Sequence, residues 1–189
     1  MPIRRIFIAI DISEEARAAV ATYIEKLHSD FVRIRVGWER AEKLHFTIRF
    51  LGDTDEERLD KVCEIVRATA SKMEPFPVRL IETGVFPHYK SAKVLWLGPK
   101  QGSDEMTAIK AEIDAGLDLI GIEPEKRKFH PHLSIARIRD LEKSRTLVRV
   151  HRQRQFEPIV FAAAGITVYE SKLQKTGSEY FPVRFFPFK

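Results

Sequence analysis

A short pattern that occurs twice constrains the fold of this chain more than any other feature. Residues 44–48 read LHFTI and residues 131–135 read PHLSI, so both follow the order His, apolar, hydroxyl, Ile. Each copy lies in a segment whose β-branched and aromatic content is typical of a strand. The two histidines are 87 residues apart in a chain of 189. We therefore expect two related halves that each supply one such strand.

The period of a strand gives this pattern its chemical meaning. Residues i and i+2 of a strand point to the same face. The first copy thus places His45 beside Thr47, and the second places His132 beside Ser134. The apolar residue between them faces the other way and can enter a core. Two halves that face each other would bring two imidazoles and two hydroxyls around one cleft.

That set of groups suits hydrolysis of a phosphodiester. The reaction takes a proton from the attacking water and gives another to the leaving oxygen, and histidine can do either near neutral pH. The hydroxyls of Thr47 and Ser134 can donate hydrogen bonds to the non-bridging phosphate oxygens. A single His-x-Thr in a strand is usually structural. Two matching copies are harder to explain in that way, because four polar groups would need partners in a dry core.

The remaining pattern predicts an α+β fold with helices between strands and some hairpin connections. We expect helix starts at Ser13, at the capping box that begins at Thr54, and at Ser103. A fourth helix is expected over 141–152. The expected strands cover 3–10, 44–51, 78–86, 93–97, 132–138, 159–169 and 180–186. No linker separates the halves, so we expect one domain, 1–189, made of two intertwined lobes that pack together.

Charge favours an anionic partner. The net charge is +5 and the sequence pI is about 9.3. The excess lies in residues 126–154, which hold ten Lys and Arg against two acidic residues. A phosphate-rich ligand such as RNA fits this excess. The alternative is a solvated helix face.

Cysteine content and hydropathy indicate a cytoplasmic protein without a membrane segment. The single cysteine, Cys63, has no partner for an intrachain disulfide, and a reducing setting is the default for such a chain. No apolar stretch approaches the roughly 20 residues of a membrane helix, and the apolar run after Arg5 is too short for a secretory signal. No long exposed apolar stripe is evident, so we expect a monomer.

At this point the sequence resembles a known family, the 2H phosphoesterases, and within it the RNA 2′,3′-cyclic phosphodiesterases, historically called 2′-5′ RNA ligases. The family motif is a paired His-x-[Thr/Ser]-x, which stands here at His45 and His132. Ser134 departs from the more frequent Thr but keeps the hydroxyl. The likeness extends over segments 6–10, 44–52, 84–87, 94–98, 130–137 and 169–173, with Tyr180.

The resemblance implies two lobes, each a mainly antiparallel sheet with helices packed outside, around a central cleft. It also implies hydrolysis of an RNA 2′,3′-cyclic phosphate to a 2′-phosphate without metal or cofactor. On the family pattern His132 is the proton acceptor and His45 the proton donor. The expected partner is RNA with a cyclic phosphate end, which includes tRNA fragments.

Two further candidate site residues each lie five positions past one of the motif histidines. The family carries a phosphate-contacting Arg at the position of Arg137, yet Arg137 is five residues past His132. A regular strand would point it away from Ser134, so the strand must end or bulge there, or Arg137 must act from a turn. Phe50 lies five residues past His45. We hypothesise that it offers a face on which a base can stack; the alternative is a core residue.

Other interpretations remain open. The same two histidines serve 2′-5′ RNA ligation, which is the reverse reaction, and a non-catalytic RNA-binding module could keep the same fold. His130 with His132 could suggest a zinc pair, but no sequence signal supplies the third ligand of a catalytic site. Among the other histidines, His151 has charged neighbours and is expected at the surface.

Overall fold

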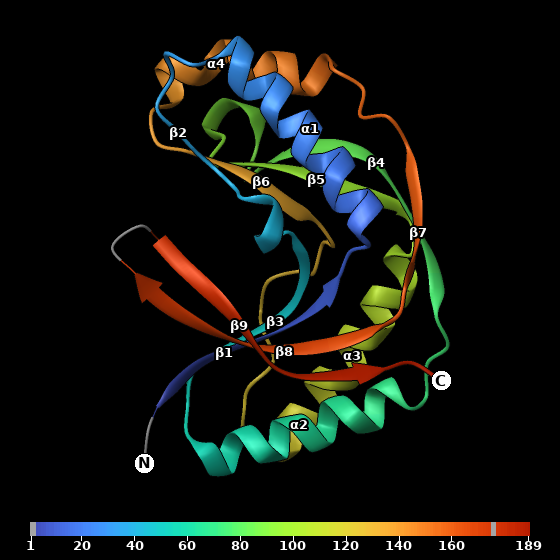
Figure 1. Cartoon of the computed structure of the whole chain (residues 1–189). Coiled ribbons are helices and arrows are strands. Elements are labelled where there is room, and N and C mark those ends of the chain that lie inside the picture. The colour runs from blue at the N-terminus through green and yellow to red at the C-terminus, as the bar shows by residue number, and fades with distance from the viewer. Residues whose placement is uncertain (1–2, 175–176) are drawn as a thin grey trace.

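The computed structural model describes residues 3–174 and 177–189, which form two β-sheets, four longer helices and two short 3₁₀ helices (Figure 1). The strands are β1 (Arg4–Asp11), β2 (Val36–Trp38), β3 (His45–Thr54), β4 (Phe76–Phe86), β5 (Val94–Gln101), β6 (Leu133–Ile138), β7 (Ile159–Ala163), β8 (Gly165–Gln174) and β9 (Gly177–Pro187). The helices are α1 (Glu14–Asp30), η1 (Ala41–Lys43), α2 (Glu56–Ala70), η2 (Tyr89–Ser91), α3 (Ser103–Leu119) and α4 (Leu141–Gln153).

Both sheets draw strands from distant parts of the chain. The first sheet has the order β3-β1-β8-β9, so it joins the N-terminal strands to the C-terminal ones. The second has the order β2-β6-β5-β4-β7. The paired strands in each sheet are antiparallel. The two lobes are therefore intertwined, and the expected α+β architecture is confirmed.

The helices cover the outer sides of the sheets. In Figure 1, α2 and α3 lie below the first sheet, and α1 and α4 lie against the second. Helix α2 contacts β8, β9 and α3, while α1 contacts β7 and α4 contacts β4. Among the described residues, no helix combines the length and the apolar character needed to cross a membrane.

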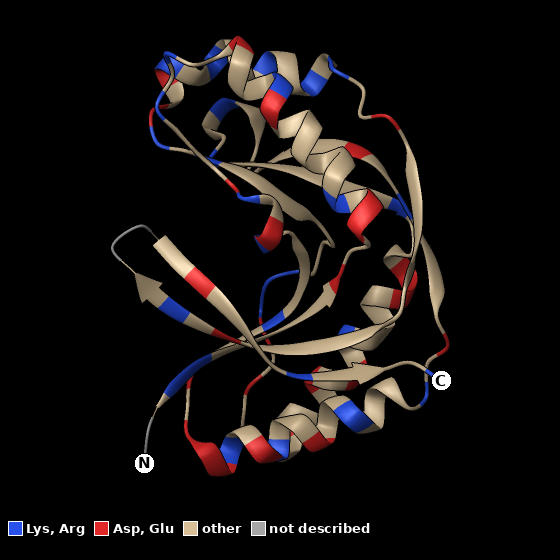
Figure 2. Cartoon of the chain, in the orientation of Figure 1, with Lys and Arg blue, Asp and Glu red and all other residues tan. Residues whose placement is uncertain are grey.

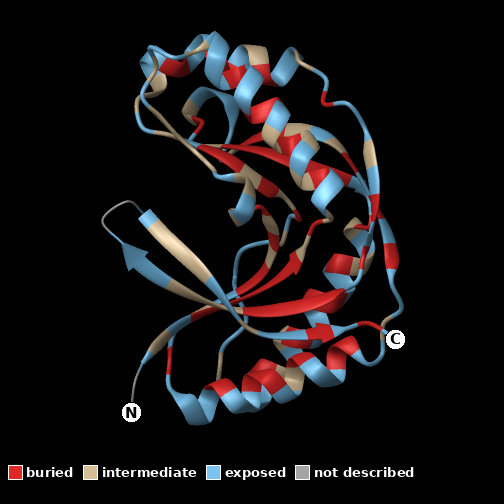
Figure 3. Cartoon of the chain, in the orientation of Figure 1, coloured by how far each residue is buried: buried red, intermediate tan, exposed pale blue. Residues whose placement is uncertain are grey.

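Burial explains why the motif strands hold their positions. In β3, Phe46 and Ile48 are almost fully buried, whereas His45 and Thr47 between and before them remain partly accessible. Figure 3 shows the buried residues concentrated along the strands and on the inner faces of the helices. Burial of an aliphatic or aromatic side chain stabilises the fold by about 1.5–3 kcal/mol each. The alternation thus fixes the face on which each motif histidine lies.

Side-chain caps set the starts of α1, α2 and α4, and two expectations for helix starts are wrong. The capping box does not begin at Thr54: Asp55 is the N-cap of α2, and its Oδ1 accepts a hydrogen bond from the backbone N–H of Arg58 at 2.8 Å. Ser13 accepts a hydrogen bond from the backbone N–H of Ala16 at 3.2 Å, which makes it the N-cap of α1. The prediction that Ser103 caps α3 is wrong: Gly102 is the N-cap and Ser103 is the first helical residue. Gly102 has φ +90°, a conformation that glycine adopts without steric cost.

A glycine pair gives the second sheet its close packing around Trp96. A Cβ on Gly84 would lie 2.0 Å from the Trp96 ring, and one on Gly98 would lie 2.8 Å from it. The indole therefore lies across both glycines, where it packs against Phe86 at 5.3 Å and His130 at 4.8 Å between ring centroids. This packing connects β4 and β5 to the segment that leads into β6.

Candidate active site

The two motif segments meet at a cavity of 250 Å³ between the sheets. His45 begins β3 at the edge of the first sheet, and His132 immediately precedes β6 of the second. All six residues singled out from the sequence line this cavity: His45, Thr47, Phe50, His132, Ser134 and Arg137. Folding therefore brings together groups from both halves of the chain.

A bulge in each motif strand resolves the conflict over Arg137 and Phe50. In β6 the pairing with β5 moves from Ser134 to Ala136 and skips Ile135. In β3 the pairing with β1 moves from Thr47 to Arg49 and skips Ile48, which is the residue of the first motif that matches Ile135. An extra residue in a strand reverses the later alternation. The bulges thus return Arg137 and Phe50 to the cavity, as one of the alternatives from the sequence required.

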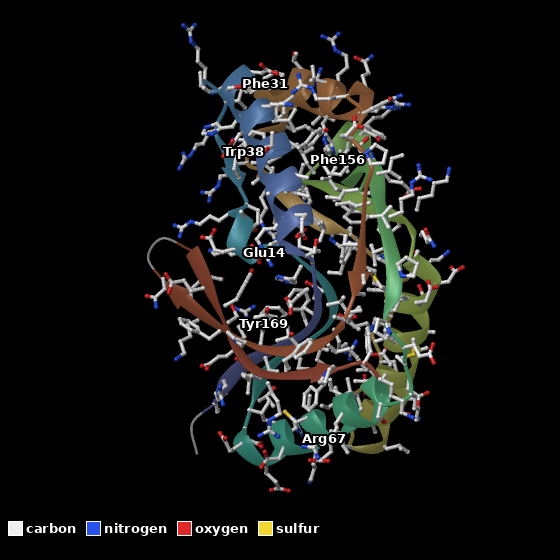
Figure 4. All side chains as sticks on the ribbon, turned by 45° about the vertical axis from the view of Figure 1, so that its right-hand side comes forward. Glu14, Phe31, Trp38, Arg67, Phe156 and Tyr169 are labelled. Atoms are coloured by element: carbon white, nitrogen blue, oxygen red, sulfur yellow. The ribbon has the colours of Figure 1, made fainter. Side chains whose placement is uncertain are left out.

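His45 is held by aromatic rings and by a hydroxyl. Its Nε2 lies 3.0 Å from Oγ1 of Thr47, and the i, i+2 spacing predicted that these two side chains lie side by side. Its ring stacks on Phe7 at 5.0 Å and meets Tyr180 edge-on at 5.4 Å between centroids. Tyr169 lies 6.0 Å away, and Figure 4 labels it on the lower sheet. These contacts restrict the imidazole to one orientation.

His132 is oriented by the backbone. Its Nδ1 lies 2.7 Å from the carbonyl oxygen of His130, to which an Nδ1–H donates. In the neutral ring this leaves Nε2 without a proton and able to accept one. Phe86 packs edge-on against the same ring at 4.8 Å between centroids.

The two histidines differ in their electrostatic surroundings. Burial lowers the pKa of His45 to about 4, and the nearby Asp11 carboxylate opposes this shift. Burial also lowers the pKa of His132, and the positive charges of Arg127 and Arg137 lower it further. Both shifts favour the neutral imidazole at pH 7. An anion such as a phosphate would raise both pKa values.

Asp11 is an acidic group that lies beside His45 and not beside His132. Its Oδ2 accepts a hydrogen bond from the Thr167 hydroxyl at 2.6 Å, and its Oδ1 accepts one from the Tyr169 hydroxyl at 2.7 Å. These two bonds hold the carboxylate in place beside His45. No carboxylate is among the groups that shift the pKa of His132. Asp11 therefore raises the pKa of His45 against the larger lowering that burial causes.

A second cavity of 470 Å³ continues from the first. The two cavities share five lining residues, Thr47, Phe50, Phe86, Arg127 and His132, so they form one groove. The Phe50 side chain is 61% exposed and lines both parts. The core alternative for Phe50 is therefore wrong, and an aromatic face is available to a ligand.

Sequence reasoning missed several residues of the groove. Glu39, Lys43, Phe86, Val94, Arg127 and Tyr180 complete the first cavity. Lys43 lies in η1, before β3 begins, so the period of the strand could not have identified it. Glu39 follows β2, a strand of three residues, and carried no usable pattern. Burial raises the pKa of the Glu39 carboxyl.

A buried ion-pair network holds the segment that carries Arg127. Arg49 is 4% exposed and lies 3.6 Å from Asp114 and 3.2 Å from Glu125. Lys110 reaches the same two carboxylates, at 2.7 Å and 3.1 Å. Glu125 is thereby tied to β3 and α3, two residues before Arg127, so the network fixes one wall of the groove.

The expectation for His151 was wrong. This residue is fully buried: its Nδ1 lies 3.0 Å from the Tyr23 hydroxyl and its Nε2 lies 3.1 Å from the Gly84 carbonyl oxygen. It lies on the inner face of α4 with Leu147 and Val148, where the helical period places it.

No group of three or more His, Cys, Asp or Glu suited to a metal ion occurs in residues 3–174 and 177–189.

Known proteins resemble this chain along nearly its whole length. Proteins named RNA 2′,3′-cyclic phosphodiesterase from Methanocaldococcus jannaschii and Thermotoga maritima are 29% and 30% identical over 177 residues. Each match covers 93% of this chain, with 96% and 91% of the relatives. The crystal structure of TT0787 of Thermus thermophilus matches with a TM-score of 0.79 at 23% identity, covering 97% of both chains.

The fold and the family are both established by these similarities. The crystal structure of E. coli LigT complexed with 3′-AMP also gives a TM-score of 0.79, at 21% identity, and covers 100% of this chain and 99% of LigT. The sequence profile of the 2′-5′ RNA ligase superfamily matches residues 15–175. This chain therefore belongs to the 2′-5′ RNA ligase superfamily.

Proposed function

We propose that this protein hydrolyses the 2′,3′-cyclic phosphate at RNA 3′ ends to a 2′-phosphate, by a metal-independent mechanism with two histidines. The observation that carries the proposal is the cavity in which His45, His132, two hydroxyls and Arg137 come together. Relatives that share the whole length of the chain bear the name RNA 2′,3′-cyclic phosphodiesterase, which supports the same reaction.

In the proposed reaction His132 is the base and His45 the acid. Nε2 of His132 removes a proton from water while the water oxygen forms a bond to phosphorus. The bond between phosphorus and the 3′ oxygen breaks, and His45 gives its proton to that oxygen. The products are a 2′-phosphate and a free 3′-hydroxyl. The protons then redistribute through solvent, which returns both rings to their starting states.

The remaining groups stabilise the phosphate. The hydroxyls of Thr47 and Ser134 and the guanidinium of Arg137 line the same cavity as the histidines. Donors placed toward non-bridging oxygens stabilise charge that shifts during the reaction. The exposed Arg137 side chain can add a charge-assisted contact.

Substrate binding also supplies the protonation state that the mechanism needs. Burial lowers the pKa of His45 to about 4, which is too low for an acid at neutral pH. The phosphate anion and Asp11 both raise this pKa, whereas the two arginines near His132 act in the opposite direction. Substrate binding therefore favours the protonated form of His45, which is the form that the proposed mechanism needs.

The test is hydrolysis of a short RNA with a 2′,3′-cyclic phosphate in excess EDTA, with the phosphate position identified by ³¹P NMR. A 2′-phosphate formed at an unchanged rate in EDTA supports the proposal. A 3′-phosphate, or loss of the reaction in EDTA, would contradict it. Joining of a 5′-hydroxyl RNA in the same mixture would show the ligation alternative, and RNA binding without turnover would indicate a non-catalytic module.

A further inference from the structure

We propose that Arg35 and Arg139 form a binding site for the RNA backbone next to Arg137. The preferred substrate is then a single-stranded oligonucleotide end and not a cyclic mononucleotide. This inference rests on the proposed function, because it takes the cyclic phosphate to lie at Arg137. It extends that function to the part of the RNA that precedes the reacting nucleotide.

The register between β2 and β6 places these side chains on the cleft face. Val36 pairs with Ile138 and Gly37 with Arg137. Directly opposed residues of an antiparallel pair share a face. Gly37 is therefore on the same face as Arg137, and the register, continued by one residue, sets Arg35 opposite Arg139.

Gly37 leaves the space between the arginines open. A Cβ at Gly37 would lie 3.8 Å from Nε of Arg139 and 3.9 Å from Cβ of Arg137. The side chain of Arg139 therefore extends over the glycine, on the face of the sheet that carries Arg137. Alternate residues of a strand are about 7 Å apart. The arginines thus continue the basic lining outward from the cavity toward the edge of the second sheet.

Their charge is available to a ligand. Arg35, Arg137 and Arg139 are all exposed, and within the described residues none of them has a carboxylate at ion-pair distance. The nearest acidic residue in sequence, Asp140, lies 3.5 Å from Lys143 instead. Figure 2 shows Lys and Arg in the segments where β2 begins and β6 ends. Unpaired arginines in a row are suited to phosphates in succession along one strand.

A cyclic mononucleotide cannot occupy this binding site, because it has no phosphate beyond the one that reacts. An oligonucleotide has a further phosphate, which can lie beside Arg35 and Arg139 on the face of the second sheet that carries Arg137. The affinity that Arg35 and Arg139 add is therefore specific to longer substrates, and it depends on salt, since it comes from neutralised phosphates.

The test is binding and turnover by the double variant R35Q/R139Q, with R58Q/K100Q as a matched control. The control removes two exposed cations from α2 and from the end of β5. Fluorescence anisotropy would measure the affinity for a six-nucleotide RNA with a 2′-phosphate end, which requires no turnover. Turnover would be compared for cyclic-phosphate RNA and for 2′,3′-cyclic AMP.

We expect R35Q/R139Q to lose affinity for the RNA by about tenfold at low salt and to lower the slope of log affinity against log salt by about 1.4. Its turnover of 2′,3′-cyclic AMP should equal that of the wild type. An unchanged RNA affinity, an equal loss in the control, or an equal loss for the mononucleotide would overturn the inference. If the wild type turns over neither substrate, the proposed function fails. The anisotropy result still decides whether Arg35 and Arg139 bind the RNA backbone.

Discussion

Replacement of Phe50 by alanine should weaken substrate binding without weakening the fold. The Phe50 ring is 61% exposed and lines both parts of the groove, with the Phe7 ring 5.7 Å away. Its removal exposes little new surface, so the free energy of unfolding should change by less than about 1 kcal/mol. A base that stacks on the ring would lose about 1–3 kcal/mol of binding free energy, or roughly 5- to 150-fold in affinity.

The assay separates stacking from other effects of the substitution. We expect kcat/KM for a 2′,3′-cyclic nucleotide to fall in F50A and to remain near the wild-type value in F50W. Turnover of ribose 2′,3′-cyclic phosphate, which has no base, should not change. The matched control is F185A, which removes a phenylalanine that is 51% exposed and lies outside both cavities. An equal loss for substrates with and without a base would refute the stacking role.

Three further substitutions probe the surroundings of the cavity. D11N removes the carboxylate that raises the pKa of His45, so the alkaline limb of kcat should move to lower pH by about one unit; an unmoved limb would reduce Asp11 to a structural role. E39Q removes a negative charge from the phosphate cavity, and the inhibition constant of a nucleoside 2′-phosphate should fall about fivefold, whereas an unchanged constant would show that Glu39 does not meet the phosphate. G84A places a Cβ 2.0 Å from the Trp96 ring, and thermal unfolding should show a free energy of unfolding that is lower by about 1–3 kcal/mol. An unchanged free energy of unfolding would show that the Trp96 packing does not require a glycine at this position.

The motif residues could be located from sequence because their information is local. The i, i+2 spacing placed His45 beside Thr47, and the structure has their side chains 3.0 Å apart. The repetition of the pattern indicated that two strands would face one cavity. Neither result required knowledge of which strands pair.

The parts that escaped prediction depend on distant contacts. The sequence alone left open whether Arg137 reaches the cavity, because a bulge at Ile135 depends on the pairing of β6 with β5. The strand order of the two sheets likewise follows from pairing between the two ends of the chain. His151 is different, since its spacing from Leu147 and Val148 already placed it on the buried face of α4.

The central claim is that His45 and His132 act as acid and base, and single-turnover rates of H45A and H132A test it most directly. H88A is the matched control, because His88 is exposed and lies outside both parts of the groove. Binding of a 2′-phosphate RNA would confirm that each variant retains its fold. We expect both variants to hydrolyse cyclic-phosphate RNA at least about 10²-fold more slowly than the wild type, with H88A unaffected. A variant of either cavity histidine that keeps a rate within about tenfold of the wild type, below the usual effect of a positioned acid or base, would contradict the account.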